Sequence, residues 1–151
     1  MERIRPGLIA GFIGVSISTL TNVVCRVLGL FPEAMDLKYM AEVFVDPARD
    51  PVPAFLLGIV IHLALGTGVG VVYVLLVKPH TVLTGVVFMA INWLLMMVIL
   101  FPLTHRGFFG LAAGTIMPIA TLVLNLEYGV IVGPLAQRFS RNAPPPQPRS
   151  R

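Results

Sequence analysis

Four long apolar stretches, separated by short polar segments, dominate the sequence. They span Gly7–Phe31, Pro53–Val77, Thr81–Leu103 and Phe108–Gln137. An α-helix rises about 1.5 Å per residue, so about 20 residues are needed to cross a hydrocarbon core about 30 Å thick. Each stretch is long enough. The pattern therefore predicts an all-α integral membrane protein built as a four-transmembrane-helix bundle.

The fourth stretch is about ten residues longer than one crossing requires. It contains Pro118, and a proline inside a helix removes a backbone hydrogen bond and bends the helix. The sequence therefore predicts a kinked fourth helix, with Phe108–Met117 lying obliquely or near the outer interface.

The long polar segment after the first stretch carries several apolar side chains. Their spacing predicts a short amphipathic helix lying on the outer surface; the residues are Met35, Leu37, Tyr39, Met40, Val43 and Phe44. At the C-terminus, residues 143–151 are rich in Pro and Arg. We expect a disordered cytoplasmic tail there, following a single four-helix domain of residues 1–142.

Composition agrees with a membrane protein. Hydrophobic residues make up 56% of the chain, charged residues 12%, and the mean hydropathy is +0.88, whereas a soluble domain carries about 25% charged residues. The basic residues lie at the ends of the apolar stretches instead of forming a nucleic-acid-binding patch, so no nucleic-acid partner is predicted.

The basic residues are unevenly distributed between the two sides of the bundle. The side that holds both termini carries most of them, at Arg3, Arg5, Lys78, Arg138, Arg141, Arg149 and Arg151, and the long loop on the other side is acidic. Positive charge marks the cytoplasmic side. We expect a multi-pass protein of the bacterial inner membrane with cytoplasmic N- and C-termini.

The two halves of the chain share a pattern. Ile61–Gly70 and Leu124–Gly133 both read apolar, His or Asn, Leu, two residues, Gly, three residues, Gly, and Leu-Phe-Pro occurs at both 30–32 and 100–102. The sequence therefore predicts a 2+2 internal duplication. Since each half would enter and leave on the same side, the axis that relates the halves would lie along the membrane normal.

Small residues spaced about four apart allow membrane helices to approach closely. The glycines predicted to pack helices are Gly11, Gly14, Gly58, Gly66, Gly70, Gly114, Gly129 and Gly133. The alternative is that they line a groove for a cofactor or substrate.

Five polar side chains fall inside the apolar stretches, namely Asn22, His62, Asn92, Asn125 and Glu127. Polar groups in a membrane either join helices or mark a functional site. Matched depth predicts that His62 reaches a polar group such as Asn22. Glu127 lies about 200° from Asn125 around its helix, so it is expected to meet another chain, or a cation at the inner interface such as Lys78 or Arg138.

Sites for catalysis are hard to build from this sequence, and no enzyme is predicted. Cys25 is the single cysteine, which excludes an intrachain disulfide and a thiolate metal cluster. His80 and His105 lie at opposite faces, so they do not form a paired-His haem site. A Gly-rich phosphate loop, a carboxylate pair and clustered metal ligands are also missing from the pattern.

Three functional hypotheses remain. The first is an accessory or structural subunit of a larger respiratory or photosynthetic membrane complex. The second is a homo-oligomeric transporter or proton-conducting protein that uses His62 and Glu127. The third is a pigment- or haem-binding bundle, because Gly58-x-x-x-His62 resembles the spacing in chlorophyll-binding helices.

The chain resembles a group of uncharacterised bacterial four-helix membrane proteins of unknown function. The likeness rests on short patches in Gly7–Gly133, namely the Gly-rich first stretch, Met35-Asp36, His62-x-x-x-Gly66, Tyr73, Trp93, Phe101-Pro102 and Tyr128-Gly129-x-x-x-Gly133. The resemblance implies a membrane location and the four-helix fold, and it implies no activity. Members of that group tend to carry His where this chain has Asn125, which puts a ligand or proton role of that position in doubt here.

Overall fold

The computed structural model describes residues 4–141. Within these residues all regular secondary structure is helical, and no strand occurs. Four helical segments are long and apolar enough to cross a membrane. They are α1 (Arg5–Val27), α2 (Pro51–Leu76), the segment formed by α3 (Val82–Leu95), η3 (Met96–Leu100) and α4 (Phe101–Leu103), and α5 (Met117–Arg141). The predicted fold class is confirmed. The predicted tail, residues 143–151, lies outside the described residues.

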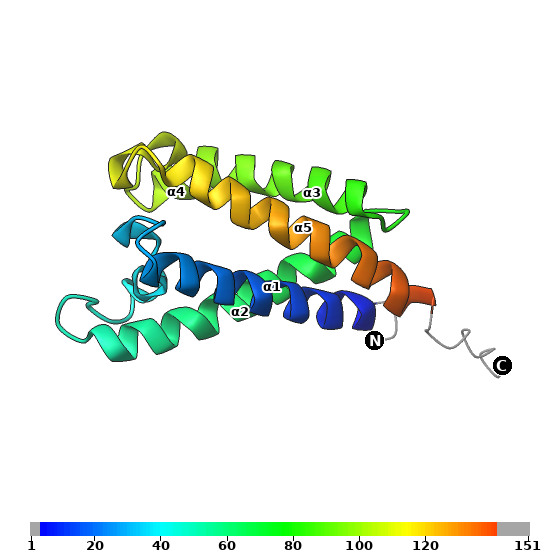
Figure 1. The fold of residues 1–151 in the computed structure, drawn as a ribbon, viewed down its shortest axis with the longest axis horizontal. Helices are drawn as coiled ribbons and strands as arrows, with labels where there is room; N and C mark the ends of the chain where they lie inside the picture. The colour runs from blue at the N-terminus through cyan, green and yellow to red at the C-terminus, as the bar shows by residue number, and fades with distance from the viewer. Residues whose placement is uncertain (1–3, 142–151) are drawn as a thin grey trace.

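The helices form two antiparallel pairs, α1 with α2 and α3 with α5, and the two pairs are joined by the contact between α1 and α5 (Figure 1). The spans of α1 and α5 are each 39% buried, against 17% for α2 and for α3. α1 and α5 therefore form the centre of the bundle, and α2 and α3 flank it.

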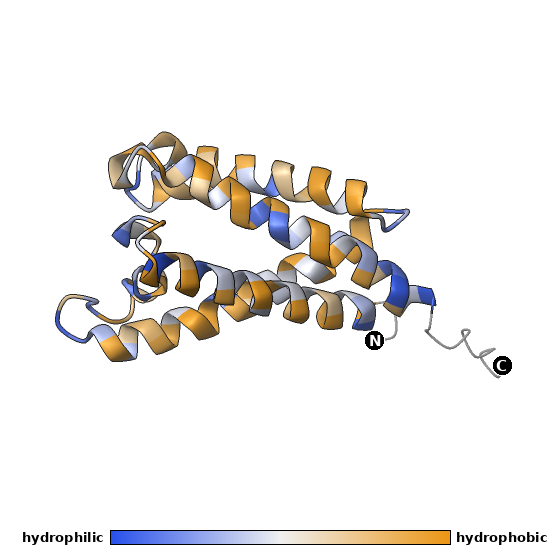
Figure 2. Ribbon diagram, viewed as in Figure 1, coloured by the Kyte–Doolittle hydropathy of each residue, from blue (hydrophilic) through white to orange (hydrophobic). Residues whose placement is uncertain are grey.

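The two ends of the bundle differ in their loops. The start of α1, the α2–α3 turn and the end of α5 lie at one end, which we call the inner end; the long α1–α2 loop and η4 lie at the other, the outer end (Figure 1). Figure 2 shows that hydrophilic residues collect at both ends, while the helices between them are mainly hydrophobic.

Local sequence explains where α3 begins. Thr81 is its N-cap: the Thr81 hydroxyl accepts a hydrogen bond from the Thr84 backbone N–H at 3.2 Å, and the Thr84 hydroxyl accepts one from the Thr81 N–H at 2.9 Å. This capping box satisfies two donors that the helix leaves unpaired. The α2–α3 turn is thereby closed tightly at the inner end.

The fourth stretch is not a single helix kinked at Pro118, whereas the prediction that Phe108–Met117 lies near the outer end agrees with the structure. Phe108–Ala113 forms a separate 3₁₀ helix, η4, at the outer end, and Gly114 follows with φ = 136°. α5 begins only at Met117, so Pro118 lies in its first turn, where a missing N–H interrupts no helical hydrogen bond. The proline inside this helix is Pro134.

The outer loop also differs from the predicted surface helix. It forms two short 3₁₀ helices, η1 (Glu33–Met35) and η2 (Leu37–Ala41), and the Leu37 and Ala41 side chains are buried against the bundle. A Cβ added at Gly58 of α2 would overlap the Leu37 carbonyl. The loop therefore folds onto α2 because Gly58 leaves room for its backbone.

Ion pairs at the surface stabilise the α1–α2 loop and join it to Arg106. Arg106 contacts Glu42 at 3.2 Å and donates to the Tyr39 carbonyl at 3.3 Å. The Lys38 ammonium lies 3.2 Å from Glu33 and, as its hydrogen-bond donor, lowers the pKa of that exposed carboxyl below its ordinary value.

Glycines set the spacing within each helix pair. A Cβ at Gly11 would lie 3.1 Å from the Gly70 Cα, and a Cβ at Gly129 would lie 2.6 Å from the Gly85 carbonyl oxygen. Ordinary carbon contacts are about 3.5–4.0 Å, so both pairs require glycine at these points. Gly114 was also expected to pack helices, but a Cβ there would meet nothing within 4 Å. It serves the turn before α5.

The contacts of the two pairs recur in one register. In the first pair Gly11 meets Gly70 and Val15 meets Gly66. In the second pair the corresponding contacts join Thr81 to Gly133 and Gly85 to Gly129. At these contacts, a residue of α1 corresponds to the residue 70 positions later, and a residue of α2 to the residue 63 positions later. This common register is what the predicted duplication requires.

Candidate functional site

A cavity of about 390 Å³ lies between the helices in the outer half of the bundle. α1, α2, α3, η3 and α5 form its walls, and the outer loop lies at its mouth. Most of its lining is apolar. Four of the five polar residues singled out from the sequence line it, namely Asn22, His62, Asn92 and Asn125; Glu127 does not.

Two neighbouring features shape this cavity. Met96–Leu100 of its wall is a π-helix, a rare local widening that occurs frequently at functional sites. At the mouth, Asp36, Glu42 and Arg106 supply charged side chains. The cavity is therefore apolar along its walls and charged only toward the outer loop.

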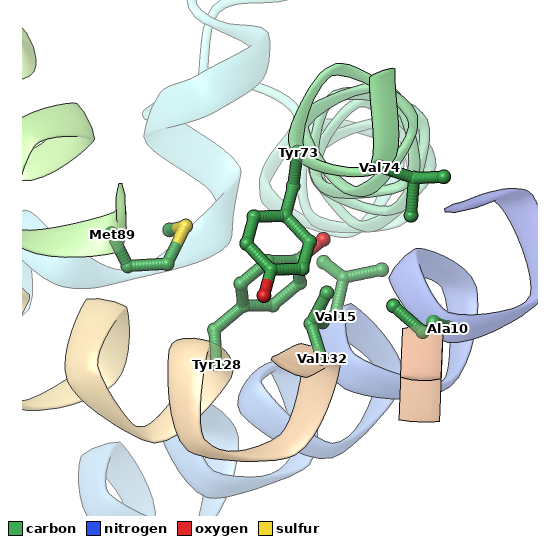
Figure 3. Packing of buried hydrophobic residues seen from close by; sticks show 8 residues of the cluster. Ala10, Val15, Tyr73, Val74, Met89, Tyr128 and Val132 are labelled. Atoms are coloured by element: carbon green, nitrogen blue, oxygen red, sulfur yellow. The ribbon is translucent and has the colours of Figure 1, made fainter. Parts of the chain in front are cut away.

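Aromatic side chains pack between the helices next to the cavity, and one of them, Tyr128, lines it. The Tyr128 hydroxyl donates to the Gly66 carbonyl at 2.5 Å and so joins α5 to α2. The Tyr73 hydroxyl is 2.9 Å from that of Thr84, and the Tyr73 ring packs on Phe88 with centroids 5.3 Å apart, which joins α2 to α3. Figure 3 shows both tyrosine rings filling the space between α2 and α5.

The polar pair on the α3–α5 wall is bonded directly between the two helices. The Asn92 amide donates to the Asn125 side-chain oxygen at 3.2 Å, and the Asn125 amide donates to the Thr121 carbonyl at 2.9 Å. The Trp93 indole N–H also donates a hydrogen bond to the Thr121 hydroxyl at 3.1 Å. These bonds join the two helices, as the structural interpretation of the asparagines predicts.

The polar groups on the α1–α2 wall are arranged differently. His62 Nδ1 lies 2.9 Å from the Thr19 hydroxyl oxygen, and that hydroxyl donates its proton to the Val15 carbonyl at 2.7 Å. Since a hydroxyl has one proton to give, the His62 Nδ1–H is the donor to Thr19. In the uncharged ring, Nε2 is then an acceptor. His62 thus reaches α1, with Thr19 as its partner in place of the suggested Asn22.

Two polar atoms on this wall have no hydrogen-bond partner among the described residues. They are the Ser18 hydroxyl oxygen and the Asn22 side-chain oxygen. Ser18 and Asn22 are 4% and 5% exposed, and both line the cavity. The Asn22 side-chain amide group donates to the Met35 carbonyl at 3.3 Å. The Asn22 side-chain oxygen therefore stays available as an acceptor. Buried polar atoms without a partner are uncommon in proteins. The α1–α2 wall therefore has hydrogen-bonding capacity that the described residues do not use.

Glu127 lies elsewhere. Its carboxyl accepts a hydrogen bond from Thr21 of α1 at 2.6 Å, while its second oxygen is buried without a partner in the described part of the chain. Within the described residues its bonding partner is therefore Thr21, and neither Lys78 nor Arg138 forms an ion pair with it; contact with another chain stays a prediction. α5 packs between α1 and α3, so its Glu127 face and its Gly129 face are both occupied within the bundle.

Sequence reasoning missed some of these groups. Thr19 and Thr21 were not distinguished, because threonines in membrane helices commonly bond their own backbone and carry no pattern of their own. Ser18 continues the spacing of Gly7, Gly11 and Gly14, which identifies its face of α1 but not the lack of a partner.

The comparisons with known proteins give a family and no activity. The chain belongs to the family described as "Family of unknown function (DUF6789)", whose model matches residues 1–147. This confirms the resemblance to an uncharacterised family. No significant match was found among curated proteins or among solved structures.

Proposed function

We propose that this member of a family of unknown function is a non-enzymatic membrane protein that binds a small lipid-soluble molecule between its helices. The observation that carries the proposal is the cavity of about 390 Å³, whose apolar wall contains a few convergent polar groups. Ligand sites are typically concavities of about 300–1,000 Å³ with this combination of lining groups.

The position of the cavity supports a ligand that arrives from the bilayer. The walls belong to helices long enough to span a membrane, so the surrounding solvent over most of the cavity's depth is hydrocarbon. The cavity lining lies mainly in the outer half of the helices, and the buried Tyr73 and Val74 of α2, further toward the inner end, are not part of it. A molecule that binds here without passing through the protein fits this position better than a continuous path across the membrane.

The transporter hypothesis requires His62 and Glu127 to lie on one path, and their contacts do not support this. His62 bonds to Thr19 and Glu127 bonds to Thr21. Thr19 and Thr21 are two positions apart on α1, which corresponds to about 200° of rotation. His62 and Glu127 therefore contact opposite sides of α1. A single path that uses His62 and Glu127 together is therefore not supported.

We further propose a bacterial inner-membrane location with cytoplasmic termini. Among the described residues, Arg5, Lys78, Arg138 and Arg141 lie at the inner end, while the outer loop is rich in acidic residues. This charge asymmetry supports the orientation. Membership of a larger respiratory or photosynthetic complex, and pigment or haem binding through His62, stay predictions.

The test compares what copurifies with the protein and with two tryptophan variants. Leu124 lines the cavity, whereas its neighbour Val123 is outside the lining and 52% exposed. Leu124→Trp fills the cavity, and Val123→Trp adds the same bulk on an exposed face of α5, about 100° away around the helix. Each protein is extracted gently from its own membrane, and bound small molecules are identified by solvent extraction and mass spectrometry.

We expect a lipid-soluble compound to be enriched with the unaltered protein and with Val123→Trp, and to be depleted with Leu124→Trp. The same lipid profile for all three proteins would contradict the proposal. The purification also separates the other hypotheses, because copurifying subunits would support an accessory role and a coloured sample would support a pigment or haem site.

A further inference from the structure

We infer that the cavity recognises an uncharged, hydroxyl-bearing lipid-soluble molecule, and that the hydroxyl is held on the α1–α2 wall by Asn22, His62 and Ser18. This inference rests on the proposed function and adds the chemistry of the ligand's polar group. Examples of the class are phenols, quinols and lipid alcohols with an apolar body.

The duplication provides an internal comparison. Asn92 stands 70 positions after Asn22, and Asn125 stands 63 positions after His62, the same offsets that relate the helix contacts. On the α3–α5 wall, the two asparagines bond to each other. On the α1–α2 wall, His62 is bonded to Thr19, and the Asn22 oxygen is left without a partner. One of the two equivalent polar pairs is thus bonded directly across its two helices, and the other is not.

The open groups are close to one another along α1. Ser18 and Asn22 are four residues apart, which places them on one face about one turn apart. Thr19, which holds His62, lies between them in the sequence. All three of Ser18, Asn22 and His62 line the same cavity, and the two unpartnered oxygens are buried in its wall, so small side-chain rotations bring them to a polar group of a ligand.

The hydrogen-bonding roles select the ligand. The Asn22 side-chain oxygen accepts, and Nε2 of the uncharged His62 ring also accepts because its Nδ1–H is given to Thr19. The Ser18 hydroxyl is free to donate or accept. Two acceptors require a donor from the ligand, and a hydroxyl can donate to one of them while it accepts from Ser18. A molecule with only carbonyl or ether oxygens leaves both acceptors unpaired.

The absence of charge follows from the same wall. Ser18, Asn22 and the uncharged His62 carry no formal charge, and the charged side chains of the lining, Asp36, Glu42 and Arg106, belong to the mouth. A charged group is costly to bury in an apolar cavity without a countercharge. A neutral polar group is therefore preferred at this depth.

The inference is tested with 4-octylphenol and its methyl ether, 4-octylanisole, which share an apolar body and differ in the O–H group. Binding of each tritiated probe to the immobilised full-length protein is measured in one detergent, with empty micelles as the blank. We expect the phenol to bind about tenfold more tightly, the effect of about one hydrogen bond to a buried acceptor.

The variants separate the roles of the wall residues. Asn22→Leu combined with His62→Phe removes both acceptors and is expected to abolish the preference for the phenol. Ser18→Ala removes the donor and is expected to weaken both probes while the preference remains. The control Ser16→Ala alters a hydroxyl that already donates to the Phe12 carbonyl and is expected to change neither. Thermal melting monitored by Trp93 fluorescence verifies that each variant is folded.

The outcomes are distinct. Equal binding of the two probes to the unaltered protein would overturn the hydroxyl assignment and leave the cavity as a binding site. A preference for the phenol that persists without Asn22 and His62 would overturn their role. If neither probe binds, the proposed function fails together with this inference.

Discussion

Replacing Gly129 with Leu is expected to push α3 away from α5 and destabilise the bundle. A Cβ at Gly129 would lie 2.6 Å from the Gly85 carbonyl oxygen and 3.0 Å from the Val86 Cα. Because carbon contacts are normally about 3.5–4.0 Å, the helices must separate by about 1 Å for the first added atom alone. The other side-chain atoms of leucine require a larger displacement.

The energetic cost is estimated from overpacking. Forcing extra carbon atoms into a filled interface typically costs about 1–3 kcal/mol, and exchange of Gly for a good helix former returns up to about 1 kcal/mol. Gly68→Leu is the matched control, because a Cβ at Gly68 meets nothing within 4 Å. It receives the helix-forming gain without the clash. The difference between the two variants therefore isolates the clash, at about 2 kcal/mol.

Trp93 provides the assay. It is the single tryptophan of the chain, and its indole on α3 donates to Pro118 and Thr121 of α5. Its fluorescence therefore reports whether the two helices are together. In a protein of this size about 2 kcal/mol corresponds to a difference of about 4–8 °C in melting temperature, with Gly129→Leu lower than Gly68→Leu. Equal melting temperatures, with an unchanged oligomer profile, would refute the assignment of Gly129 to helix packing.

Three further outcomes follow from the structure. Reporters fused to the C-terminus and inserted in the loop before α2 should label opposite sides of the membrane, and labelling on one side would reject the orientation. A double-mutant cycle of Asn92→Ala and Asn125→Ala should give a coupling of about 0.6 kcal/mol, as expected for an interhelical hydrogen bond in a membrane, whereas additive effects would argue against their bond. Lys38→Met should raise the pKa of the Glu33 carboxyl toward its ordinary value, because the ammonium that stabilises the carboxylate is lost; NMR titration that finds the same Glu33 pKa in both proteins would contradict this.

The sequence alone determined the number of membrane helices and the places where they approach. Runs of about 20 apolar residues have few alternatives in a bilayer, since each backbone polar group must be paired within the helix. The glycine spacing identified Gly11 and Gly70, and likewise Gly129 and Gly133, as contact points. These features depend on residues near one another in the chain, so local pattern was sufficient.

The tertiary structure decided which faces those helices share and which polar groups remain without a partner. Glu127 meets Thr21, and His62 meets Thr19, because α1 lies between α2 and α5. Helical periodicity gives the angle between two side chains but not the neighbour on each side. Asn22 and Asn92 occupy equivalent positions in the two halves, but the Asn92 amide donates to Asn125 and the Asn22 amide donates to the Met35 carbonyl. Their difference arises from contacts across the bundle, which no local pattern in the sequence specifies.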